Sequence, residues 1–429
     1  MNIKKASITG GQIPKGQVKV SGAKNSATKL LAASLICDKE VILNNFPTEL
    51  VDANFKFEYI QDIGGILNID RDNDQVKIDS SKLSSENLDH YNYAFRTTYL
   101  LVPGLIKKDG KAKIPYPGGC KIGQRGYDLH MMVWEKLGAK VEEFEDHIEV
   151  ISEGFIGTDI NFPISTIGGT ESALICGAIA KGLTTMRNAY ISPEVEDLIN
   201  FLRASGVNIK VVGNSFIQIE GQSYIPGSIY SIMPDRIEAL TWMVYGILSK
   251  GDITILDVPF STMDIPLLHL KEAGIDFYRN SKNIRISDDC LVNGIIQPFE
   301  LATGTHPGII SDMQPFYTLL GLHADGFSRI FDYRYPERIK YCEELSKFYN
   351  DRLTFESGKI TTRGDSDIVP TSAEVTSTDL RGSMALVIAA LLSDGVSVIN
   401  NVDMALRGYN NLQKKLSELG VQIEITDQK

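Results

Sequence analysis

The chain has little cysteine and no long hydrophobic run. Its apolar stretches, such as Ala385 to Leu392, are much shorter than the roughly 18 residues that cross a bilayer. Lys4 and Lys5 near the start are not followed by an apolar core, so the sequence predicts no secretory signal. We therefore expect a cytoplasmic protein that has no membrane partner.

Positive charge is also scarce, because 43 Lys and Arg side chains stand against 54 Asp and Glu, a net charge of −11. This balance argues against nucleic acid as a partner. No G-x-x-x-x-G-K-[ST] loop or strand-linked G-x-G-x-x-G appears, so nucleotide hydrolysis and nicotinamide chemistry lose their main support. No metal site or cofactor is expected either, because the five cysteines form no C-x-x-C pair: Cys37, Cys120, Cys176, Cys290 and Cys342.

One sequence motif recurs along the rest of the chain: an amphipathic helix that ends in Gly, followed by a short strand in which apolar and polar residues alternate. Each glycine suits a helix C-cap. The copies are about 70 residues apart, which is longer than the period of solenoid repeats. One copy is degraded and is expected near Phe348 to Leu353. The clear copies carry Gly64, Gly138, Gly206, Gly274 and Gly420.

A second sequence motif comes before the first motif in most repeats. It is a helical run of small and apolar residues, followed by a Gly-led alternating strand such as Gly251 to Asp257 or Gly395 to Asn400. Each repeat is therefore predicted as strand, helix, strand, helix, strand. Six repeats fit an α/β protein of two domains, with three βαβαβ-type pseudo-repeats in each.

We expect the seam between the domains near Tyr230 to Asp235, where the third repeat ends. The N-terminal strand, which contains Val18 to Val20, fits either half of the chain. We assign one discontinuous domain to residues 1–22 plus 234–429 and the other to residues 23–233. A cleft between two such domains is the usual place for a ligand.

The loop from Pro117 to Arg125 places a thiol between two cations and among three glycines. Lys121 and Arg125 would stabilise the thiolate of Cys120, and a thiol pKa that is ordinarily near 8.5 allows proton transfer near neutral pH. The alternative is a surface loop with an incidental cysteine. Composition alone favours neither reading.

Two further segments carry candidate site residues. Lys24-Asn25 sits where a strand passes into a helix, and an ammonium beside helix N-terminal amides makes an anion site. A capped helix start with a solvated lysine is the simpler interpretation of this segment alone. His130 fits either a ligand or a hydrogen-bonded structural role, and we favour the structural role.

Several arginines lie just before or within predicted helix starts. In a pseudo-symmetric protein, equivalent positions converge, so an anion clamp of several arginines is reasonable. Asp312 would then be a carboxylate among cations, either a base or an ion-pair partner. The arginines are Arg96, Arg125, Arg236, Arg334, Arg381 and Arg407.

Taken in chain order, these segments resemble the enolpyruvyl transferases, and the Cys120 loop resembles the members that act on UDP-N-acetylglucosamine. The resemblance covers nearly the whole chain and implies a two-domain inside-out α/β barrel. The segments are Lys24-Asn25, Gly118 to His130, Pro234 to Glu238, Ser311 to Gln314, Asp379 to Arg381 and Arg407 to Tyr409.

The resemblance implies two small-molecule substrates. The enolpyruvyl group of phosphoenolpyruvate would pass to the 3-hydroxyl of UDP-N-acetylglucosamine with release of phosphate, the first committed step of peptidoglycan precursor synthesis. Cys120 would give a proton to the enol methylene, could form a covalent adduct with phosphoenolpyruvate, and would be the target of fosfomycin. Asp312 would take the proton from the attacking hydroxyl. The sequence assigns no oligomeric state.

The resemblance also implies the binding residues. Phosphoenolpyruvate carries close to three negative charges, and Lys24, Asn25, Arg125 and Arg407 would bind it. Asn25, Arg96 and Asp312 would help to position the acceptor, and Arg334, Arg381 and Asp379 would support the closed site. The uridine-diphosphate positions are Arg125, Gly126, Tyr127, Asp128, Leu129, Thr166, Ile167, Gly168 and Ile330.

Three segments depart from the family pattern. Gly126-Tyr127 stands where Pro-Val is usual beside the uracil. The segment from Tyr333 to Lys340 in the fifth repeat drifts from the usual pattern, and the segment from Thr305 to Gly308 ahead of Asp312 is also unusual. An enolpyruvyl transferase with a different nucleotide or nucleotide-sugar acceptor is therefore the second hypothesis. A catalytically silent nucleotide-sugar binding protein is disfavoured, because Cys120, Asp312 and Lys24 are all present.

Overall fold

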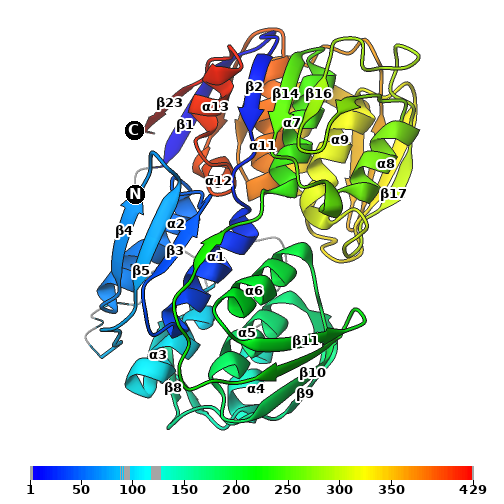
Figure 1. Ribbon diagram of the computed structural model, residues 1–429. Coiled ribbons are helices and arrows are strands. Elements are labelled where there is room, and N and C mark those ends of the chain that lie inside the picture. Colours follow the sequence, from blue (N-terminus) through cyan, green and yellow to red (C-terminus); the bar gives the residue numbers. More distant parts are fainter. Residues whose placement is uncertain (1–2, 87, 89, 91–96, 117–126, 428–429) are drawn as a thin grey trace. The chain divides into compact units, whose positions relative to one another are not determined.

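The computed structural model describes residues 3–86, 88, 90, 97–116 and 127–427. These residues form two compact units (Figure 1). Unit 1 comprises residues 3–21 and 234–427, and unit 2 comprises the described residues from 22 to 233. Each unit has its own hydrophobic core. The described strands form six small sheets, three in each unit.

Five of the six sheets share one strand pattern. A parallel pair continues into two antiparallel pairings, as in β2, β14, β16 and β15, which lie side by side in that order. In four of these sheets the last two strands form a hairpin, whereas in the fifth they are β1 and β23, from the two ends of the chain. Two helices alternate with the first strands of each repeat, so the hairpin adds one strand to the predicted strand–helix–strand–helix–strand unit. The fold class predicted from the sequence, an inside-out α/β protein with three repeats per half, is confirmed.

Unit 2 contains three repeats. The first consists of β13 (Ile229–Ser231), α1 (Lys24–Ala33), β3 (Val41–Asn44), α2 (Val51–Asp62), β4 (Ile66–Asp70) and β5 (Gln75–Asp79). The second includes α3 (Val102–Asp109), β6 (Lys111–Pro115), α4 (Asp128–Lys136), β7 (Lys140–Glu143) and β8 (His147–Ile151). The third consists of β9 (Asp159–Thr166), α5 (Ile167–Ile179), β10 (Leu183–Ala189), α6 (Pro193–Ala204), β11 (Asn208–Val212) and β12 (Phe216–Glu220).

Unit 1 contains the other three repeats. The fourth consists of β2 (Lys15–Lys19), α7 (Arg236–Leu248), β14 (Asp252–Leu256), α8 (Asp264–Glu272), β15 (Tyr278–Arg279) and β16 (Ile284–Ile286). The fifth consists of β17 (Glu300–Ala302), α9 (Gln314–Leu322), β18 (Phe327–Phe331), α10 (Lys340–Tyr349), β19 (Leu353–Glu356) and β20 (Lys359–Arg363). The sixth consists of β21 (Glu374–Thr376), α11 (Leu380–Leu392), β22 (Val396–Asn400), α12 (Asp403–Leu406), α13 (Leu412–Glu418), β23 (Glu424–Asp427) and β1 (Lys4–Thr9).

The first helix of each repeat lies inside its unit, and the second helix lies nearer the surface. In unit 1, the helices α7, α9 and α11 are buried along nearly their whole length. Each carries small and apolar residues on all of its sides, which is typical of a buried helix. The outer helix α10 instead buries one stripe, which includes Tyr341, Leu345 and Phe348. Two inner helices, α5 and α11, begin shortly after the parallel strands β9 and β21, and polar side chains lie at these junctions.

The glycines of the first recurring motif end the second helix of their repeats, and each has a left-handed backbone conformation. Gly64 has φ 88° and Gly420 has φ 74°, which only glycine adopts at low cost. The degraded copy predicted near Phe348 to Leu353 is present, and there Asn350 takes the position with φ 50°. The local pattern therefore located all six repeats.

Two N-terminal strands belong to unit 1. β2 pairs in parallel with β14, and β1 lies between β22 and β23 in the sixth sheet. β13 supplies the parallel partner of β3 in unit 2. Backbone hydrogen bonds mark both passages of the chain between the units: Asp235 N donates to Ser21 O at 2.8 Å, and Ala23 N donates to Met233 O at 2.7 Å.

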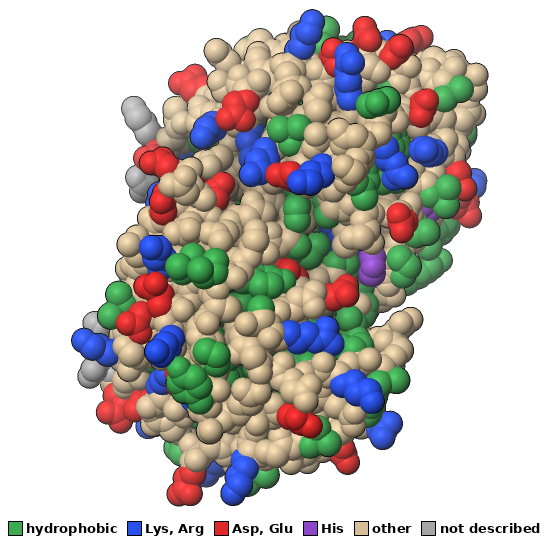
Figure 2. Space-filling view, in the orientation of Figure 1, with side chains coloured by type: hydrophobic (Ala, Val, Ile, Leu, Met, Phe, Trp, Pro, Cys, Tyr) green, Lys and Arg blue, Asp and Glu red, His purple; other side chains and the backbone are tan. Residues whose placement is uncertain are grey.

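Charges of both signs are mixed on the face shown in Figure 2, where Lys and Arg side chains are scattered among those of Asp and Glu. Among the described residues, no helix combines the length and the apolarity needed to cross a membrane.

Candidate active site

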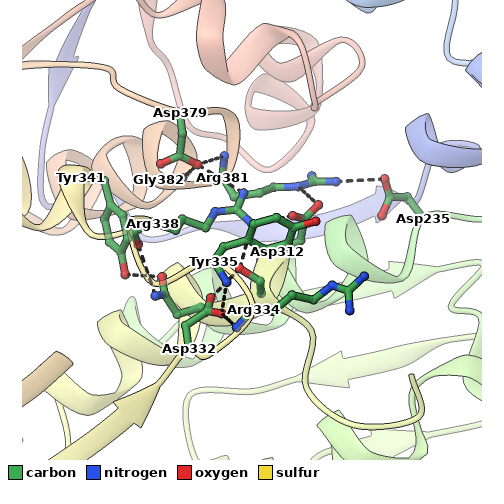
Figure 3. Close-up of polar contacts among 12 residues, drawn as sticks. Asp235, Asp312, Asp332, Arg334, Tyr335, Arg338, Tyr341, Asp379, Arg381 and Gly382 are labelled. Atoms are coloured by element: carbon green, nitrogen blue, oxygen red, sulfur yellow. Dashed lines mark hydrogen bonds and ion pairs between the residues drawn. The ribbon is translucent and has the colours of Figure 1, made fainter. Parts of the chain in front are cut away.

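A cluster of charged side chains gathers at the helix starts of unit 1 (Figure 3). Asp379 caps α11, because its Oδ1 accepts hydrogen bonds from the backbone N–H groups of Arg381 and Gly382, each at 3.1 Å. The same oxygen accepts from Arg338 Nη2 at 3.3 Å. Asp379 therefore both caps α11 and holds the Arg338 guanidinium in place.

Asp312 lies between two arginines. Arg338 Nη1 donates to its Oδ1 at 2.6 Å, and Arg381 Nε is 3.5 Å from its Oδ2. The Asp312 side chain is 27% exposed, whereas those of Arg338 and Arg381 are 3% and 1% exposed. The carboxylate therefore reaches solvent at the edge of a buried cationic pair, where a ligand hydroxyl can approach it.

Arg381 is the most unusual side chain of this cluster. None of its three guanidinium nitrogens makes a hydrogen bond to a described residue, although Asp235 Oδ2 lies 3.7 Å from Nη2. The guanidinium lies 5.3 Å from the centre of the Tyr409 ring. A buried donor without an acceptor costs roughly 1–3 kcal/mol, and more for a charged group. The planar fork of donors matches a carboxylate or a phosphate.

Neighbouring groups keep this arginine ionised. Burial alone would lower the pKa of Arg381, but the Tyr409 hydroxyl and the carboxylates of Asp235 and Asp312 outweigh it and raise that pKa. Burial raises the pKa of Asp235, and Arg381 opposes this rise. Other buried donors here also lack partners among the described residues: Arg338 Nε and the hydroxyls of Thr303, Ser377 and Thr378.

Arg407 follows α12 on the segment that packs against the start of α11. A Cβ at Gly408 would lie 2.2 Å from Leu380 Cδ2, so any other residue there would require the Leu380 side chain to shift. Tyr409 then places its ring beneath Arg381. Arg334 lies differently, because its backbone N–H donates to Asp332 Oδ1 while its side chain extends away from Asp332 (Figure 3).

In unit 2, Lys24 and Asn25 form the first turn of α1. The preceding Ala23 provides no side-chain cap, and the first turn contains no acidic residue. Lys24 Nζ is 2.8 Å from Asp52 Oδ2 of α2. The helix start therefore offers N–H groups and an ammonium at one place, which suits an anion.

Two helix starts of unit 2 carry predicted nucleotide positions. Asp128 begins α4, and Thr166 caps α5 by accepting from Gly169 N at 3.3 Å. His130 joins the two helices, because its Nδ1 lies 2.8 Å from Ser172 Oγ. A Cβ on Gly168 would come within 2.8 Å of His130 Nε2. The structural role favoured for His130 is therefore supported.

Tyr127, at another predicted nucleotide position, contacts an acidic residue. Its hydroxyl donates to Glu143 Oε2 at 2.9 Å, and this bond, with burial and the charge of Glu143, raises the pKa of Tyr127 to about 12. The Tyr116 ring lies 5.6 Å from that of Tyr127. Leu129 and Ile167 are partly exposed, whereas the Ile330 side chain is buried in β18.

The predicted residues Arg96, Cys120, Arg125 and Gly126 lie outside the described residues. Among the described residues, no group of three or more His, Cys, Asp or Glu side chains could hold a metal ion.

Sequence reasoning missed Arg338, Asp52 and the buried pair Lys56 and Glu171. Arg338 follows Tyr335-Pro336-Glu337, and neither a helix-cap pattern nor the recurring glycine motif marks this position in the sequence. Asp52 lies one residue inside the start of α2, where an acidic side chain is ordinary.

Comparison with known proteins gives a family. Residues 8–416 match the family model described as EPSP synthase (3-phosphoshikimate 1-carboxyvinyltransferase). The chain is 34% identical over 419 residues to a UDP-N-acetylglucosamine 1-carboxyvinyltransferase of Ruthia magnifica subsp. Calyptogena magnifica, covering 97% of this chain and 98% of that protein.

Two solved structures share the fold. The enolpyruvyl transferase NikO from Streptomyces tendae superposes with a TM-score of 0.86 at 21% identity, covering 100% of both chains. EPSP synthase from Acinetobacter baumannii superposes with a TM-score of 0.74 at 18% identity, covering 99% of this chain and 100% of that chain.

Proposed function

The chain belongs to the enolpyruvyl transferase family, and from this premise we propose that it transfers the enolpyruvyl group of phosphoenolpyruvate to the 3-hydroxyl of UDP-N-acetylglucosamine and releases phosphate. The observation that carries the proposal is Arg381, a buried guanidinium without a hydrogen-bond acceptor among the described residues. Such a group is suited to an anionic substrate. We place the reaction in the cytoplasm, as the first committed step of peptidoglycan precursor synthesis, which serves cell shape and division.

The donor substrate needs several cations. Lys24, Asn25, Arg125 and Arg407 bind the phosphate and the carboxylate of phosphoenolpyruvate in this proposal. Arg381 supports them, since its donors are buried and already oriented by Asp235 and Asp312. Fixed cations also stabilise the charge that develops during addition and elimination, at no cost of reorganisation.

The reaction proceeds by addition and then elimination. The hydroxyl oxygen bonds to C2 of phosphoenolpyruvate and gives its proton to Asp312, while the methylene carbon C3 takes a proton from Cys120. The Cys120 thiolate then takes a proton back from C3, the C2–O bond to phosphate breaks, and the enol ether forms, while the proton held by Asp312 leaves with the phosphate. Asp312 suits the base role because its carboxylate is partly exposed while its arginine partners are buried.

The acceptor nucleotide is bound at the starts of α4 and α5 in this proposal. Helix N–H groups attract a diphosphate, and Asp128, Leu129, Thr166, Ile167 and Gly168 lie at these two starts. Arg96, Arg125, Gly126, Tyr127 and Ile330 complete the predicted set, with Asn25 and Asp312 near the sugar. Arg334 and Asp379 support the site, Asp379 through the α11 cap and Arg338.

One contact favours a second candidate acceptor. Tyr127 directs its hydroxyl to Glu143 and its ring to Tyr116, at a position predicted to lie beside the base. An aromatic pair with a carboxylate is a different surface from the Pro-Val expected there. A different nucleotide or nucleotide sugar is therefore the alternative acceptor for the same enolpyruvyl transfer.

The test is phosphate release from phosphoenolpyruvate, with and without UDP-N-acetylglucosamine, together with mass spectrometry of the product. We expect phosphate and the enolpyruvyl ether only when both substrates are present. Turnover with another nucleotide from a panel, and none with UDP-N-acetylglucosamine, would favour the alternative. No turnover with any acceptor would contradict both.

Labelling by fosfomycin tests the thiol separately. The purified protein is incubated with the epoxide and its mass is measured. We expect one adduct, lost in Cys120→Ser, while the far-ultraviolet circular dichroism spectrum is unchanged. Undiminished labelling of the variant would place the reactive thiol elsewhere.

A further inference from the structure

Three charged side chains are buried beneath the Lys24-Asn25 turn of unit 2, with the carboxylates of Asp52 and Glu194 near them. Lys29 of α1, Lys56 of α2 and Glu171 of α5 form this group, here named the α1 charge cluster. The Lys56 side chain is fully buried, and Glu171 is 2% exposed. Charged side chains are rarely so deeply buried, so the cluster calls for a physical reason.

The contacts of the cluster converge on the backbone of α1. Lys29 Nζ donates to Asn25 O at 3.0 Å and to Glu171 Oε1 at 3.1 Å. Lys56 Nζ donates to Thr28 O. Two ammonium groups therefore hold carbonyls in the first turns of α1, and Glu171 ties one of them to α5.

Helix α2 contributes twice to the same turn. Asp52 and Lys56 lie four residues apart, on one face of α2. Asp52 holds the Lys24 ammonium at 2.8 Å, while Lys56 holds the backbone one turn further along α1. Both the side chain of Lys24 and the helix that carries it are thus fixed from α2.

The α1 charge cluster is not expected to increase the free energy of unfolding of unit 2. Burial lowers the pKa of Lys56 well below its usual value, helped by Lys29 and opposed by Glu171 and Asp52. Burial also raises the pKa of Glu171, against the effect of Lys29 and Lys56. Replacing such buried ionic groups with apolar side chains of similar size is often neutral or stabilising. A packed apolar junction would therefore hold α1, α2 and α5 together at least as firmly.

We propose that Lys29, Lys56 and Glu171 are positioning residues that hold Lys24 and Asn25 in the orientation needed to bind the anionic donor substrate. The inference rests on the proposed function for the identity of that substrate. It assigns none of the three residues a contact with the substrate.

The test is a triple variant, Lys29→Met, Lys56→Met and Glu171→Met, compared with the unaltered protein. We expect an equal or higher midpoint of thermal unfolding, and a KM for phosphoenolpyruvate about 10-fold higher. The KM for the acceptor should rise less than that for phosphoenolpyruvate, because Lys29 holds Asn25, which both substrates would contact, whereas Lys24 is predicted to bind only the donor. Hydrogen exchange of the amides at residues 24–29 should be faster.

Lys107→Met is the matched control. Lys107 of α3 makes the same kind of contact at the other end of this segment, donating to Ile36 O at 2.7 Å and to Asp38 Oδ2 at 2.6 Å. This variant should exchange faster near residue 36, with an unchanged KM for phosphoenolpyruvate. If the triple variant does not fold, Glu171→Gln is used instead, with a smaller rise in KM expected.

Two outcomes overturn the inference: unchanged exchange at residues 24–29, or an unchanged KM for phosphoenolpyruvate. If the unaltered protein does not turn over phosphoenolpyruvate at all, the proposed function fails, and the exchange measurement decides the positioning role alone. Faster exchange confined to residues 24–29 then retains it, and unchanged exchange removes it.

Discussion

Arg381 brings a permanent positive charge into the interior of unit 1, with Asp235 and Asp312 within 4 Å and no hydrogen bond to a described residue. Arg381→Lys keeps the charge but removes the planar fork of donors. We expect kcat/KM for phosphoenolpyruvate to fall about 100-fold, the usual effect of losing one preorganised donor. Steady-state phosphate release measures it.

Arg329→Lys provides the control for this substitution. Arg329 pairs with Glu300 at 3.2 Å on the surface of the same unit, with both side chains at least half exposed. Surface pairs contribute little, so the control should show unaltered kinetics. An Arg381→Lys variant within threefold of the unaltered protein would remove Arg381 from the donor site.

His323 should make the stability of unit 1 sensitive to acid. Burial lowers its pKa to about 4, against a weaker effect of Asp365, while the unfolded chain has the usual value near 6.5. The unfolded state therefore binds the extra proton first, so stability falls as the pH drops from about 6.5 to about 4 and levels off below. The gap corresponds to roughly 3 kcal/mol.

Urea unfolding at pH 7 and pH 5 measures this effect. His323→Gln keeps a polar partner for the Tyr349 hydroxyl, which lies 2.9 Å from His323 Nε2. The variant should lose less stability between the two pH values than the unaltered protein. Equal losses in both proteins would show that another group causes the acid sensitivity.

Candidate residues with a local signature were the ones that could be selected from the sequence. Lys24 and Arg381 both lie in the first turn of an inner helix, where a short polar segment precedes an apolar run. Lys56 and Glu171 lie in helix interiors, and the sequence gives a lysine or glutamate no sign that it is buried. Their burial results from the packing of α1, α2 and α5.

The repeats were predictable because helix ends are local. A glycine that ends a helix with positive φ depends on no residue far away in the sequence, so the glycine motif recurs in each repeat. The hairpins were harder to predict, because strands such as β15, with two residues, are too short to show an alternating pattern. Their pairing with β16 is set by the sheet rather than by their own sequence.

Asn350 gives a direct test of the degraded repeat. It ends α10 with φ 50° and ψ −137°, a region that glycine adopts far more easily than other residues. Its side chain is exposed. We expect Asn350→Gly to stabilise unit 1 by roughly 1 kcal/mol and Asn350→Ala to destabilise it. Chemical unfolding of the two variants gives the comparison, and a destabilised glycine variant would contradict this account.

The assignment of the N-terminal strands depends on pairing between distant segments. The sequence placed residues 1–22 with residues 234–429 but did not identify the sheet partner of the strand that contains Val18, because its alternation fits any sheet. The structure pairs β2 with β14 and β13 with β3, so the first strand of the fourth repeat and the first strand of the first repeat come from chain segments far from the rest of their repeats. Only long-range hydrogen bonding decides such an arrangement.

This arrangement predicts that residues 22–233 fold without the rest of the chain. That segment contains α1, β3 and β13, and its hydrophobic core draws only on residues from Ala27 to Ile232. The isolated segment should unfold in one cooperative thermal transition, followed by circular dichroism. A shorter segment that ends before Ile229 should be less stable, because it lacks β13 and exposes the edge of β3. If residues 22–233 unfold without cooperativity while the intact protein unfolds cooperatively, unit 2 depends on unit 1 for its stability.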